Sequence, residues 1–598
     1  MQAKSPRKRT LWKWITSILL LLAIVLVGVS WYLSVKLRPL IREEITALVK
    51  TTSQGLYDIE YATIQTNLIT GSATINDVKI SPDTSVYQAL VASKEAPNNL
   101  YYIKLNKLSV RGFHPLLIYF KQQIKIRLLL FAQPDVVMVN QHFDFNDNKP
   151  PRPQKSPYDY ISKLFNSLQV EQIDFKDANF KYVNKNGAIP EIDSIHHFNV
   201  TLKDWLIDAH SAKDTTRIYL LKDIRIRVDH YNYATPDSMY RLKLDRLDFA
   251  VSSGKLNINQ FSLEPRYSTA DFAKVNGYAR DRYQIMVNNI SMEGINLPAY
   301  IQKKELFAQQ MQVSDGELTV YNDNRLPHRI EDKTGKFPHQ LLQRLKAKLN
   351  IDSIGLKNIN ISYAEFDRES KQVGKITFEQ TEGLILNVTN MAERKAAQPI
   401  LSADLQSYVM GQGRLKVGFK FDLNSPKGSF SYEGALTNLD GRTLNRITKP
   451  LGMVQVNRGE IKKLAFAIQA DETLAKGKLD FTYHDLSVAL LKKEEGKDRL
   501  VRQGLISFLA NNLIIYGDNP NHEGKFTSAT IQYKRKTEGS FFNYIWRSLF
   551  QGVKYSVGIT PQKEAEVRAQ IAKFEKMKAD RDLRRQRRQL RRADKDKN

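Results

Sequence analysis

Few residues in this sequence have the types and spacing that catalysis or metal binding requires. The only adjacent histidines are His196 and His197, and alternation along a strand would point their rings to opposite faces. His484-Asp485 follows a predicted strand, and a surface histidine is the simpler interpretation of both sites. Gly411-Gln412-Gly413 is too short for a phosphate loop and is typical of a hairpin turn.

The wider search for reactive motifs gives the same result. The sequence contains no Walker-type glycine loop, no HExxH and no GxSxG. The absence of cysteine excludes disulfides, thiolate zinc sites and cysteine nucleophiles. Asp174, Asp177 and Asp352 lie at predicted turns, where Asx-type hydrogen bonding is a sufficient explanation for an aspartate. We therefore expect no enzyme, no catalytic residue, no metal site and no cofactor.

The most apolar segment lies near the N-terminus, from Trp14 to Leu33, and carries no charged residue. A helix of this length would be about 30 Å long, the thickness of a bilayer's hydrocarbon core. Trp14, Trp31 and Tyr32 stand where an interfacial aromatic belt would place them. The sequence therefore predicts a transmembrane anchor over residues 14–35, with Trp14, Trp31, Tyr32 and Leu33 as its marker residues.

The leader before this segment is basic, which favours a cytoplasmic N-terminus and a translocated body. The alternative is a cleaved signal peptide, with Gly28 and Ser30 as the small residues before the cut. The length of the apolar run and the aromatic residues that follow favour a retained anchor. The formal net charge of the chain is +27, and most of it is spread along the body. That excess suggests a negatively charged membrane surface as neighbour, since a translocated domain would not meet nucleic acid.

Alternation with period two dominates the body of the chain. Arg414 to Leu423 places Leu415, Val417, Phe419 and Phe421 on one face, as expected of half-buried strands. Amphipathic helices interrupt the strands, and the proline-rich stretch Lys149 to Pro157 predicts a loop. The expected helices are Leu37 to Gln54, Pro115 to Gln123, Tyr158 to Ser167, Pro298 to Ala308, Pro338 to Ala347, Arg442 to Leu451 and Leu500 to Asn511.

An internal repeat joins distant parts of the sequence. Leu168 to Tyr182 (LQVEQIDFKDANFKY) matches Leu349 to Tyr363 (LNIDSIGLKNINISY), and Val313 to Tyr321 is a weaker third copy. We expect each copy to be a strand that turns at its Asp/Asn step and returns as a second strand. Such repeats indicate an extended array in which each unit contacts mainly its neighbours.

These motifs resemble the AsmA-like family of bacterial envelope proteins. An N-terminal anchor leads into Ile64 to Val78 (IQTNLITGSATINDV), followed by Pro134-Asp-Val-Val-Met, the repeat units and Val456 to Phe466. Pro236 to Tyr267 and Tyr321 to Pro327 resemble the Bacteroidota-type version. The resemblance implies a fold that is mainly β, with peripheral helices and an elongated, curved antiparallel sheet shaped like a groove. It also implies a function in moving lipids between membranes and in outer-membrane homeostasis.

The apolar strand faces are the candidate lipid groove, because each buried CH₂ of an acyl chain is worth about 0.8 kcal/mol. Periodicity alone favours a closed sandwich or barrel core for the same residues, whereas the resemblance favours the groove. The candidate groove residues are Leu242, Leu244, Phe249, Leu415, Val417, Phe419, Phe421, Leu479 and Phe481.

The C-terminal region contains two further signals. Phe541 to Val553 is an aromatic amphipathic segment that fits either a membrane interface or a cap on the sheet. An arginine-rich tail follows, which is either a solvated helix or a segment attracted to anionic lipid. The candidate interfacial residues are Phe542, Ile545, Trp546, Leu549 and Phe550, and the candidate anionic-surface residues are Arg584, Arg585, Arg587, Arg588, Arg591 and Arg592.

The sequence thus predicts an inner-membrane-anchored periplasmic protein that binds lipid acyl chains in a β-groove. Its expected partners are phospholipids or other envelope lipids, the inner membrane, and outer-membrane or envelope proteins, with no nucleic acid. The alternative is an envelope scaffold with a closed core that binds proteins. The expected regions are a leader (1–13), an anchor (14–35), an N-terminal β region (36–150), a middle groove region (151–330), a C-terminal β region (331–555) and a basic tail (556–598).

Overall fold

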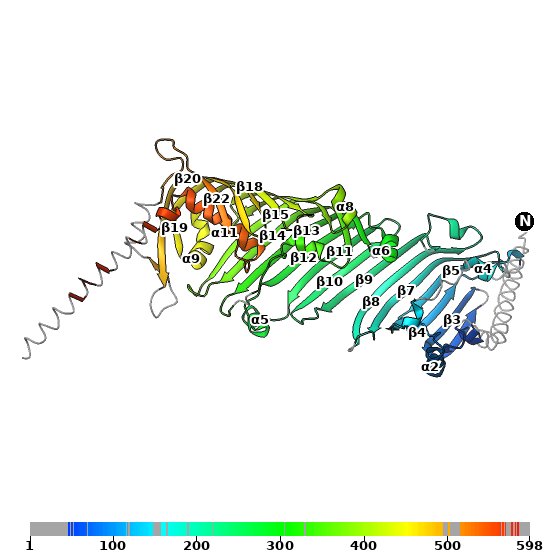
Figure 1. The fold of residues 1–598 in the computed structure, drawn as a ribbon. Coiled ribbons are helices and arrows are strands. Elements are labelled where there is room, and N and C mark those ends of the chain that lie inside the picture. The colour runs from blue at the N-terminus through cyan, green and yellow to red at the C-terminus, as the bar shows by residue number, and fades with distance from the viewer. Residues whose placement is uncertain are drawn as a thin grey trace, which may run out of the picture. The chain divides into compact units, whose positions relative to one another are not determined.

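The computed structural model describes residues 46–584, and the chain in this range is mainly β with few helices (Figure 1). Its strands form a large, curved sheet in which parallel and antiparallel pairs are mixed. The sequence-based prediction of a mainly β fold with peripheral helices is therefore confirmed, but the expected antiparallel sheet is corrected to a mixed one, because some neighbouring strands run parallel. Within this range the description leaves out residues 48, 52, 68–69, 115–116, 118–119, 148–156, 163–164, 188–189, 219, 304, 328–330, 494–499, 503–514, 564, 567–568, 570–575, 578–579 and 582.

The chain divides into two compact units. Unit 1 comprises residues 1–231 and 244–257, and unit 2 comprises residues 232–243 and 258–598. Strands β10 (Tyr240–Ala250) and β11 (Lys255–Pro265) contribute residues to both units. This division falls inside the region from 151 to 330 that the sequence predicted as a single middle segment.

Unit 1 is built on strands that alternate apolar and polar side chains. Most of its strand pairs are antiparallel, but β7 runs parallel to both β5 and β6. The strands are β1 (Tyr57–Glu60), β2 (Thr63–Asn67), β3 (Ser72–Pro82), β4 (Asn99–Arg111), β5 (Gln123–Ala132), β6 (Asp135–Asn140), β7 (Ser167–Asn184), β8 (Glu191–Ile207) and β9 (Asp223–Ala234), joined by helices α2 (Thr84–Ala92) and α4 (Pro157–Ile161) and short 3-10 turns at Asp144–Asn146 and Ser211–Lys213.

Unit 2 continues the same design with longer strands. The pair β13–β14 is parallel, and the later neighbours from β14 to β20 and β22 are antiparallel. Its strands are β12 (Arg282–Glu293), β13 (Glu305–Asp323), β14 (Lys348–Phe366), β15 (Val373–Thr389), β16 (Ile400–Val409), β17 (Gly413–Asp422), β18 (Phe430–Asp440), β19 (Val454–Ala470), β20 (Leu474–Lys493), β21 (Leu500–Arg502) and β22 (Ser528–Lys534).

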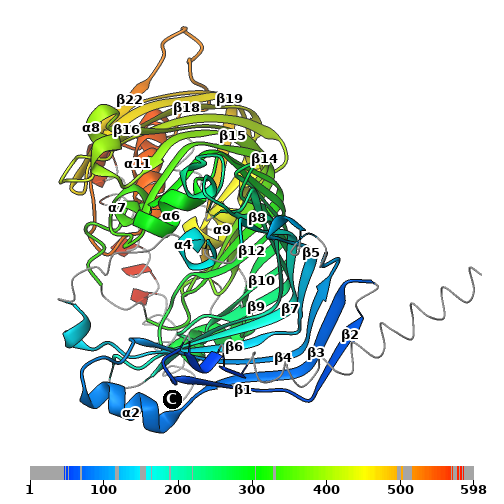
Figure 2. The same cartoon turned by 90° about the vertical axis from the view of Figure 1, so that its right-hand side faces the viewer.

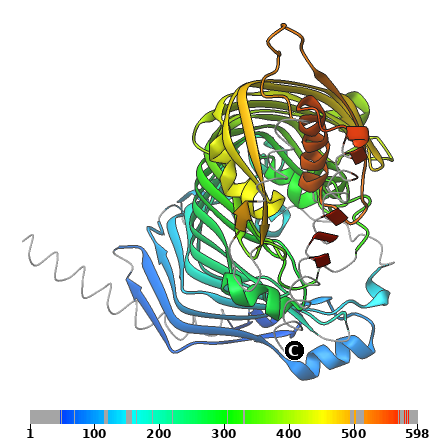
Figure 3. The same cartoon turned by 90° about the vertical axis from the view of Figure 1, so that its left-hand side faces the viewer.

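Two helices of unit 2 lie on the same side of its sheet. Figures 2 and 3 show α9 and α11 on the concave side of the curved strands. Helix α11 packs on β20 and β22, and α9 packs on β15 and β19. The helices are α5 (Thr269–Asn276), α6 (Leu297–Lys303), α7 (Pro338–Gln343), α8 (Ala392–Ala397), α9 (Asn445–Gly452) with the preceding 3-10 turn Gly441–Leu444, and α11 (Phe541–Ser556).

The repeated motif is a kinked strand, which corrects the expected strand–turn–strand form. Each of β7, β14 and β13 is one continuous strand of 18 or 19 residues. The Asp/Asn step in its middle has a positive φ, at Asp177 (54°), Asn358 (54°) and Asp315 (57°). Asp and Asn tolerate this left-handed conformation better than other L-residues, and the strand bends there without reversing.

A second residue of the motif stabilises the kink of the next strand. The Asn179 side chain accepts a hydrogen bond from the backbone N–H of His197, and Asn360 accepts one from Gln380. Both donors also have positive φ, at 56° and 50°. The motif therefore bends neighbouring strands at matched positions, and its two polar residues have a structural role.

Several expected helices are shorter than predicted. The helices predicted from Pro298 to Ala308 and from Pro338 to Ala347 end earlier, at Lys303 and Gln343. The chain then enters β13 and β14. Leu500 begins strand β21 instead of a helix, and the remainder of that segment falls largely outside the described residues. The segment predicted from Arg442 to Leu451 is confirmed as a 3-10 turn followed by α9.

The expected anchor, with Trp14, Trp31, Tyr32 and Leu33, lies outside the residues that the structure describes. Within the described part of the chain, no helix combines the length and apolar character needed to cross a bilayer.

Candidate functional site

Two rows of apolar side chains cross the strands of unit 1 on one face. The residues of each row are directly opposed in neighbouring strands, so their side chains contact across the sheet. We call these rows the unit 1 ladders. The first is Ile64–Ile75–Leu108–Phe131–Phe175–Val200–Ile226, and the second is Ala73–Val110–Leu129–Ile173–Leu202–Ile224.

The unit 1 ladders keep part of their apolar surface exposed. All seven side chains of the first ladder are half-buried, and in the second ladder only Ile173 is buried. The rings of Phe131 and Phe175 stack with their centroids 4.6 Å apart. Among the described residues, both clusters of buried apolar side chains lie in unit 2. The unit 1 ladders are therefore an apolar strand face that is not incorporated into a closed core.

The opposite face is polar on most of these strands, whereas β5 also carries apolar residues there, Leu128 and Leu130. Ser109 and Asp174 are buried there, and each has a hydrogen-bond partner on the neighbouring strand. The Thr201 hydroxyl donates to Asp174 at 3.0 Å, and the hydroxyls of Thr74 and Ser109 lie 3.3 Å apart. This alternation fixes which face of each strand carries the ladders, because a one-residue slip would exchange the two faces.

A row of charged residues borders the second ladder. Arg127, Glu171, Asp204 and Lys222 each stand two residues from a member of that ladder, and therefore lie on the same face. Lys125 pairs with Glu171 at 3.0 Å, and Asp204 pairs with Lys222 at 3.1 Å. We call this the charged row. On this face, apolar residues of the second ladder are therefore followed directly by charged residues, which lie two positions away in the chain.

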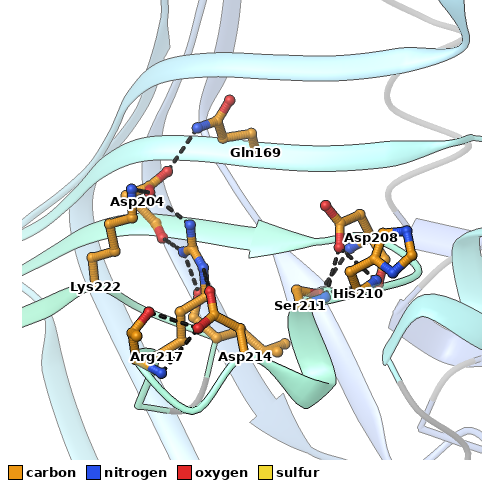
Figure 4. Close-up of polar contacts among 10 residues, drawn as sticks. Gln169, Asp204, Asp208, His210, Ser211, Asp214, Arg217 and Lys222 are labelled. Atoms are coloured by element: carbon orange, nitrogen blue, oxygen red, sulfur yellow. Dashed lines mark hydrogen bonds and ion pairs between the residues drawn. The ribbon is translucent and has the colours of Figure 1, made fainter.

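Arg217 holds the loop between β8 and β9 against the charged row. Its side chain is only 5% exposed and lies between Asp204 and Asp214, at 2.8 and 3.2 Å (Figure 4). It also donates to the backbone carbonyls of Asp204 and Leu220. Burial opposes ionisation of Asp204, but hydrogen bonds from Gln169, Arg217 and Lys222 prevail and lower its pKa to about 2. Asp204 is therefore a fixed negative charge in the row.

Unit 2 carries two equivalent ladders that extend from β12 to β22. They include the positions of the repeat that match Ile173 and Phe175, namely Ile354 and Leu356. The first is Met292–Met311–Ile354–Ile385–Ala403–Phe419–Tyr432–Ile468–Gly477–Ile531, and the second is Ile290–Val313–Leu356–Gly383–Leu405–Val417–Gly434–Phe466–Leu479–Ala529.

The two ends of the unit 2 ladders differ in exposure. Met292, Met311 and Ile354 are half-buried, whereas Ile468 and Ile531 are almost completely buried. The difference arises because α11 covers β20 and β22 at the C-terminal end. The unit 2 ladders are thus partly exposed from β12 to β14 and covered at the later strands.

The covered end is a tightly packed aromatic core. The Tyr432 hydroxyl lies 2.5 Å from the Ser548 hydroxyl of α11, and burial raises the pKa of Tyr432. A Cβ at Gly552 would lie 2.8 Å from Ile531, so glycine permits the close approach of α11. Phe337, before α7, is fully buried against Phe430, Phe541 and Tyr544.

The predicted groove residues of unit 2 share one strand face, as expected, but differ in exposure. Leu415, Val417 and Phe419 are half-buried, whereas Phe421, Leu479 and Phe481 lie in the core at the covered end. Val417 also borders a cavity of about 820 Å³ with Leu356, Leu405 and charged residues that include Lys416 and Glu433. On β10, Leu242 is half-buried, and Leu244 and Phe249 are buried.

The segment predicted to be amphipathic is helix α11, and its two faces have different environments. Ile545 and Leu549 are half-buried against the core. Phe542, Trp546 and Phe550 are 74%, 45% and 39% exposed. The helix therefore caps the sheet with one face and presents aromatic rings with the other. Of the predicted basic cluster, Arg584 is exposed, and Arg585, Arg587, Arg588, Arg591 and Arg592 lie outside the described residues.

The histidines that the sequence analysis considered have ordinary polar partners. His196 contacts Asn179 and Ser194, and His197 contacts Asp177 at 2.7 Å. His484 lies 2.5 Å from Asp518. His142, Asp144 and Asp147 have spacing compatible with a metal ion, but all three are exposed on a loop.

Sequence reasoning did not select the central residues of the unit 1 ladders. Ile173 and Phe175 stood out as members of the repeat, but Phe131 lies in the almost continuously apolar run of β5, where alternation is hidden. The parallel pairing of β5 with β7 is what places Phe131 beside Phe175. No protein-family model matches the chain, and no curated protein matches it.

Proposed function

We propose that this chain binds lipid acyl chains along the exposed apolar ladders, as an AsmA-like protein of a bacterial envelope. In this proposal the N-terminal segment anchors the chain in the inner membrane and the bulk of the chain lies in the periplasm. Its function would be lipid transport or outer-membrane homeostasis, without catalysis of its own.

The observation that carries the proposal is the half-exposed ladder of seven apolar residues from Ile64 to Ile226. At a strand spacing of about 4.8 Å, seven strands measure roughly 29 Å, which exceeds the ~15 Å of one bilayer leaflet's hydrocarbon. An extended acyl chain would therefore fit across the strands. The backbone polar groups are already paired within the sheet, so a lipid chain would bury apolar surface without leaving them unsatisfied.

The charged row supports a phospholipid in particular. A phospholipid has an apolar chain next to a charged headgroup, and the ladder face has the same order of apolar and charged surface. Lys222 and Arg127 are exposed at this border and can contact a phosphate. Glu171 and Asp204 match the positive charges of Arg127 and Lys222, so these four residues together are neutral, which suits a zwitterionic headgroup.

The test is the amount of phospholipid that co-purifies with the full chain in mild detergent. We expect the double variant Phe131→Asp/Phe175→Asp to lose most of it, because carboxylates in the ladder disfavour acyl chains. Lys176→Asp is the matched control, since Lys176 is exposed on the opposite face of the same strand. Equal phospholipid in the folded double variant and in the control would contradict the proposal.

A second candidate function is a scaffold that binds other envelope proteins. The covered end of the unit 2 ladders favours it, because α11 and the Phe337 segment close the apolar face there. The scaffold predicts stable protein complexes and no loss of phospholipid in the ladder variants. The same purification therefore separates the two functions.

A further inference from the structure

The exposed face of α11 is an aromatic stripe along one side of the helix. Phe542, Trp546 and Phe550 follow each other at intervals of four residues, which places them on the same side of a helix. The rings of Trp546 and Phe550 stack at 5.9 Å. We call these three residues the aromatic stripe. Three large rings in a row on a solvent-facing helix form an exposed apolar patch, and patches of this kind mark interaction surfaces.

The stripe is held rigidly. Tyr544 and Ser548 on the opposite side of α11 are buried in the core, and Gly552 allows the close contact with Ile531. The helix is already formed and its orientation in unit 2 is fixed by that packing. Binding through the stripe would therefore not require ordering of the helix, which removes an entropic cost that free amphipathic peptides incur.

The charged residues on α11 and next to it in the sequence are predominantly basic. Helix α11 contains Arg547 and Lys554 and no acidic residue. Lys534 and Lys536 precede it and are exposed, and Glu538 is the one acid between them and the helix. The sequence that follows the helix, from Pro561 to the C-terminus, contains 14 basic and 7 acidic residues, a net charge of +7. This combination complements an anionic surface.

We propose that the aromatic stripe of α11 rests on an anionic lipid bilayer, with its rings at the level of the headgroups. Aromatic rings favour this interfacial depth, and the neighbouring basic residues are attracted to lipid phosphates. A protein partner would also use aromatic and arginine anchors, but a helix with basic charges alone favours a lipid surface. The proposal does not rest on lipid binding by the ladders.

The absence of cysteine from the chain makes a direct test possible. Asn543→Cys introduces a unique thiol on the exposed side of α11, and an environment-sensitive nitrobenzoxadiazole label can be attached to it. The full chain is held in phosphatidylcholine nanodiscs and mixed with vesicles rich in phosphatidylglycerol. We expect a blue shift and about a threefold rise in emission, which high salt reduces. Vesicles of phosphatidylcholine alone should give a smaller response.

The control variant carries Phe542→Ser, Trp546→Ser and Phe550→Ser beside the labelled Asn543→Cys. These side chains are exposed, so the thermal midpoint should change little while the emission response is lost. A label at Glu523→Cys, on an exposed loop of unit 2, should not respond. An unchanged response in the triple variant would overturn the proposal. Failure of the labelled parent chain to respond would also overturn it.

Discussion

The ring of Phe131 on β5 stacks on that of Phe175 on β7, with centroids 4.6 Å apart and ring planes 8° from parallel. These residues lie on strands that run in the same direction and are separated by β6 in the sequence. The β5 strand pairs with the first part of β7, and β6 pairs with the last part. Two short strands thus match one long kinked strand, and the unit 1 ladders pass from β4 through β5 to β7 without a gap.

The first prediction concerns the covered end of the unit 2 ladders. Leu479 is completely buried beneath α11, so Leu479→Ala should leave a cavity and cost about 3 kcal/mol of unfolding free energy. Leu318 is a half-buried leucine on β13, and Leu318→Ala should cost only about 1 kcal/mol because its site can remain solvated. Denaturant unfolding of both variants measures the difference. Equal losses would mean that the exposed part of the sheet is packed as tightly as the core.

The second prediction concerns the kink of the repeated strand. Asn358 has a φ of 54° and is exposed, so Asn358→Gly should change stability by less than about 1 kcal/mol. Asn358→Val should cost about 2 kcal/mol, because a β-branched side chain disfavours the left-handed conformation. Thermal unfolding compares the two variants directly. If valine were tolerated as well as glycine, the kink would not depend on the residue at this position.

The sequence was sufficient to predict the strands but not their pairing. Alternation identified the shared face of Leu415, Val417, Phe419 and Phe421, because the side-chain period of a strand is two. It did not specify the partner of each strand, and so the parallel contact of Phe131 with Phe175 could not be foreseen. The Asp177 step was predicted as a turn, since Asp at a turn and Asp at a left-handed kink give the same local pattern.

The exposure of the ladder residues could also not be predicted from the sequence. Leu479 and Leu356 have the same kind of alternating neighbours, but α11 covers only the first. An amphipathic pattern indicates that a helix has an apolar face and does not identify what that face contacts. The segment of α11 was correctly predicted to be amphipathic: one face caps the sheet and the other is exposed, and its contact with a membrane interface stays a prediction.

The third prediction concerns the arginine that holds the β8–β9 loop. Arg217→Lys keeps the charge but loses the planar fork that contacts Asp204, Asp214 and two backbone carbonyls, and should cost about 2 kcal/mol at neutral pH.

The same variant should change the acid dependence of stability. The pKa of Asp204 is about 2 in the folded protein, against a reference value of 3.8. Its contribution to the free energy of unfolding is therefore complete above the reference pKa and is lost as the pH falls through the folded pKa. We expect Arg217→Lys to make this loss shallower in the acid range. An unchanged acid profile would show that Gln169 and Lys222 are sufficient to hold the carboxylate.

The fourth prediction concerns the buried His339 of α7. Its ring packs against Phe421 at 4.9 Å, and burial lowers its pKa from 6.5 to about 4 despite the nearby carboxylates of Asp422 and Glu472. The unfolded chain therefore binds a proton before the folded chain does. The free energy of unfolding should have its full value above about pH 6.5 and should decrease toward about pH 4, by up to about 3 kcal/mol.

His339→Phe removes this titration while keeping a ring of similar size. The pH dependence of the unfolding free energy between about pH 6.5 and 4 should then become smaller than in the parent chain. A variant with the same slope as the parent would show that other groups cause the acid sensitivity.

The most direct test of lipid binding is photo-crosslinking in cells that express the chain and are labelled with radioactive phosphate. A benzophenone amino acid replaces Phe175 in the unit 1 ladder, or Lys176 on the opposite strand face, in otherwise identical full-length chains. We expect ultraviolet light to attach radiolabelled phospholipid to the chain with the probe at position 175 and not at position 176. Equal labelling at both positions, or none at position 175 in a stably accumulated protein, would contradict the account.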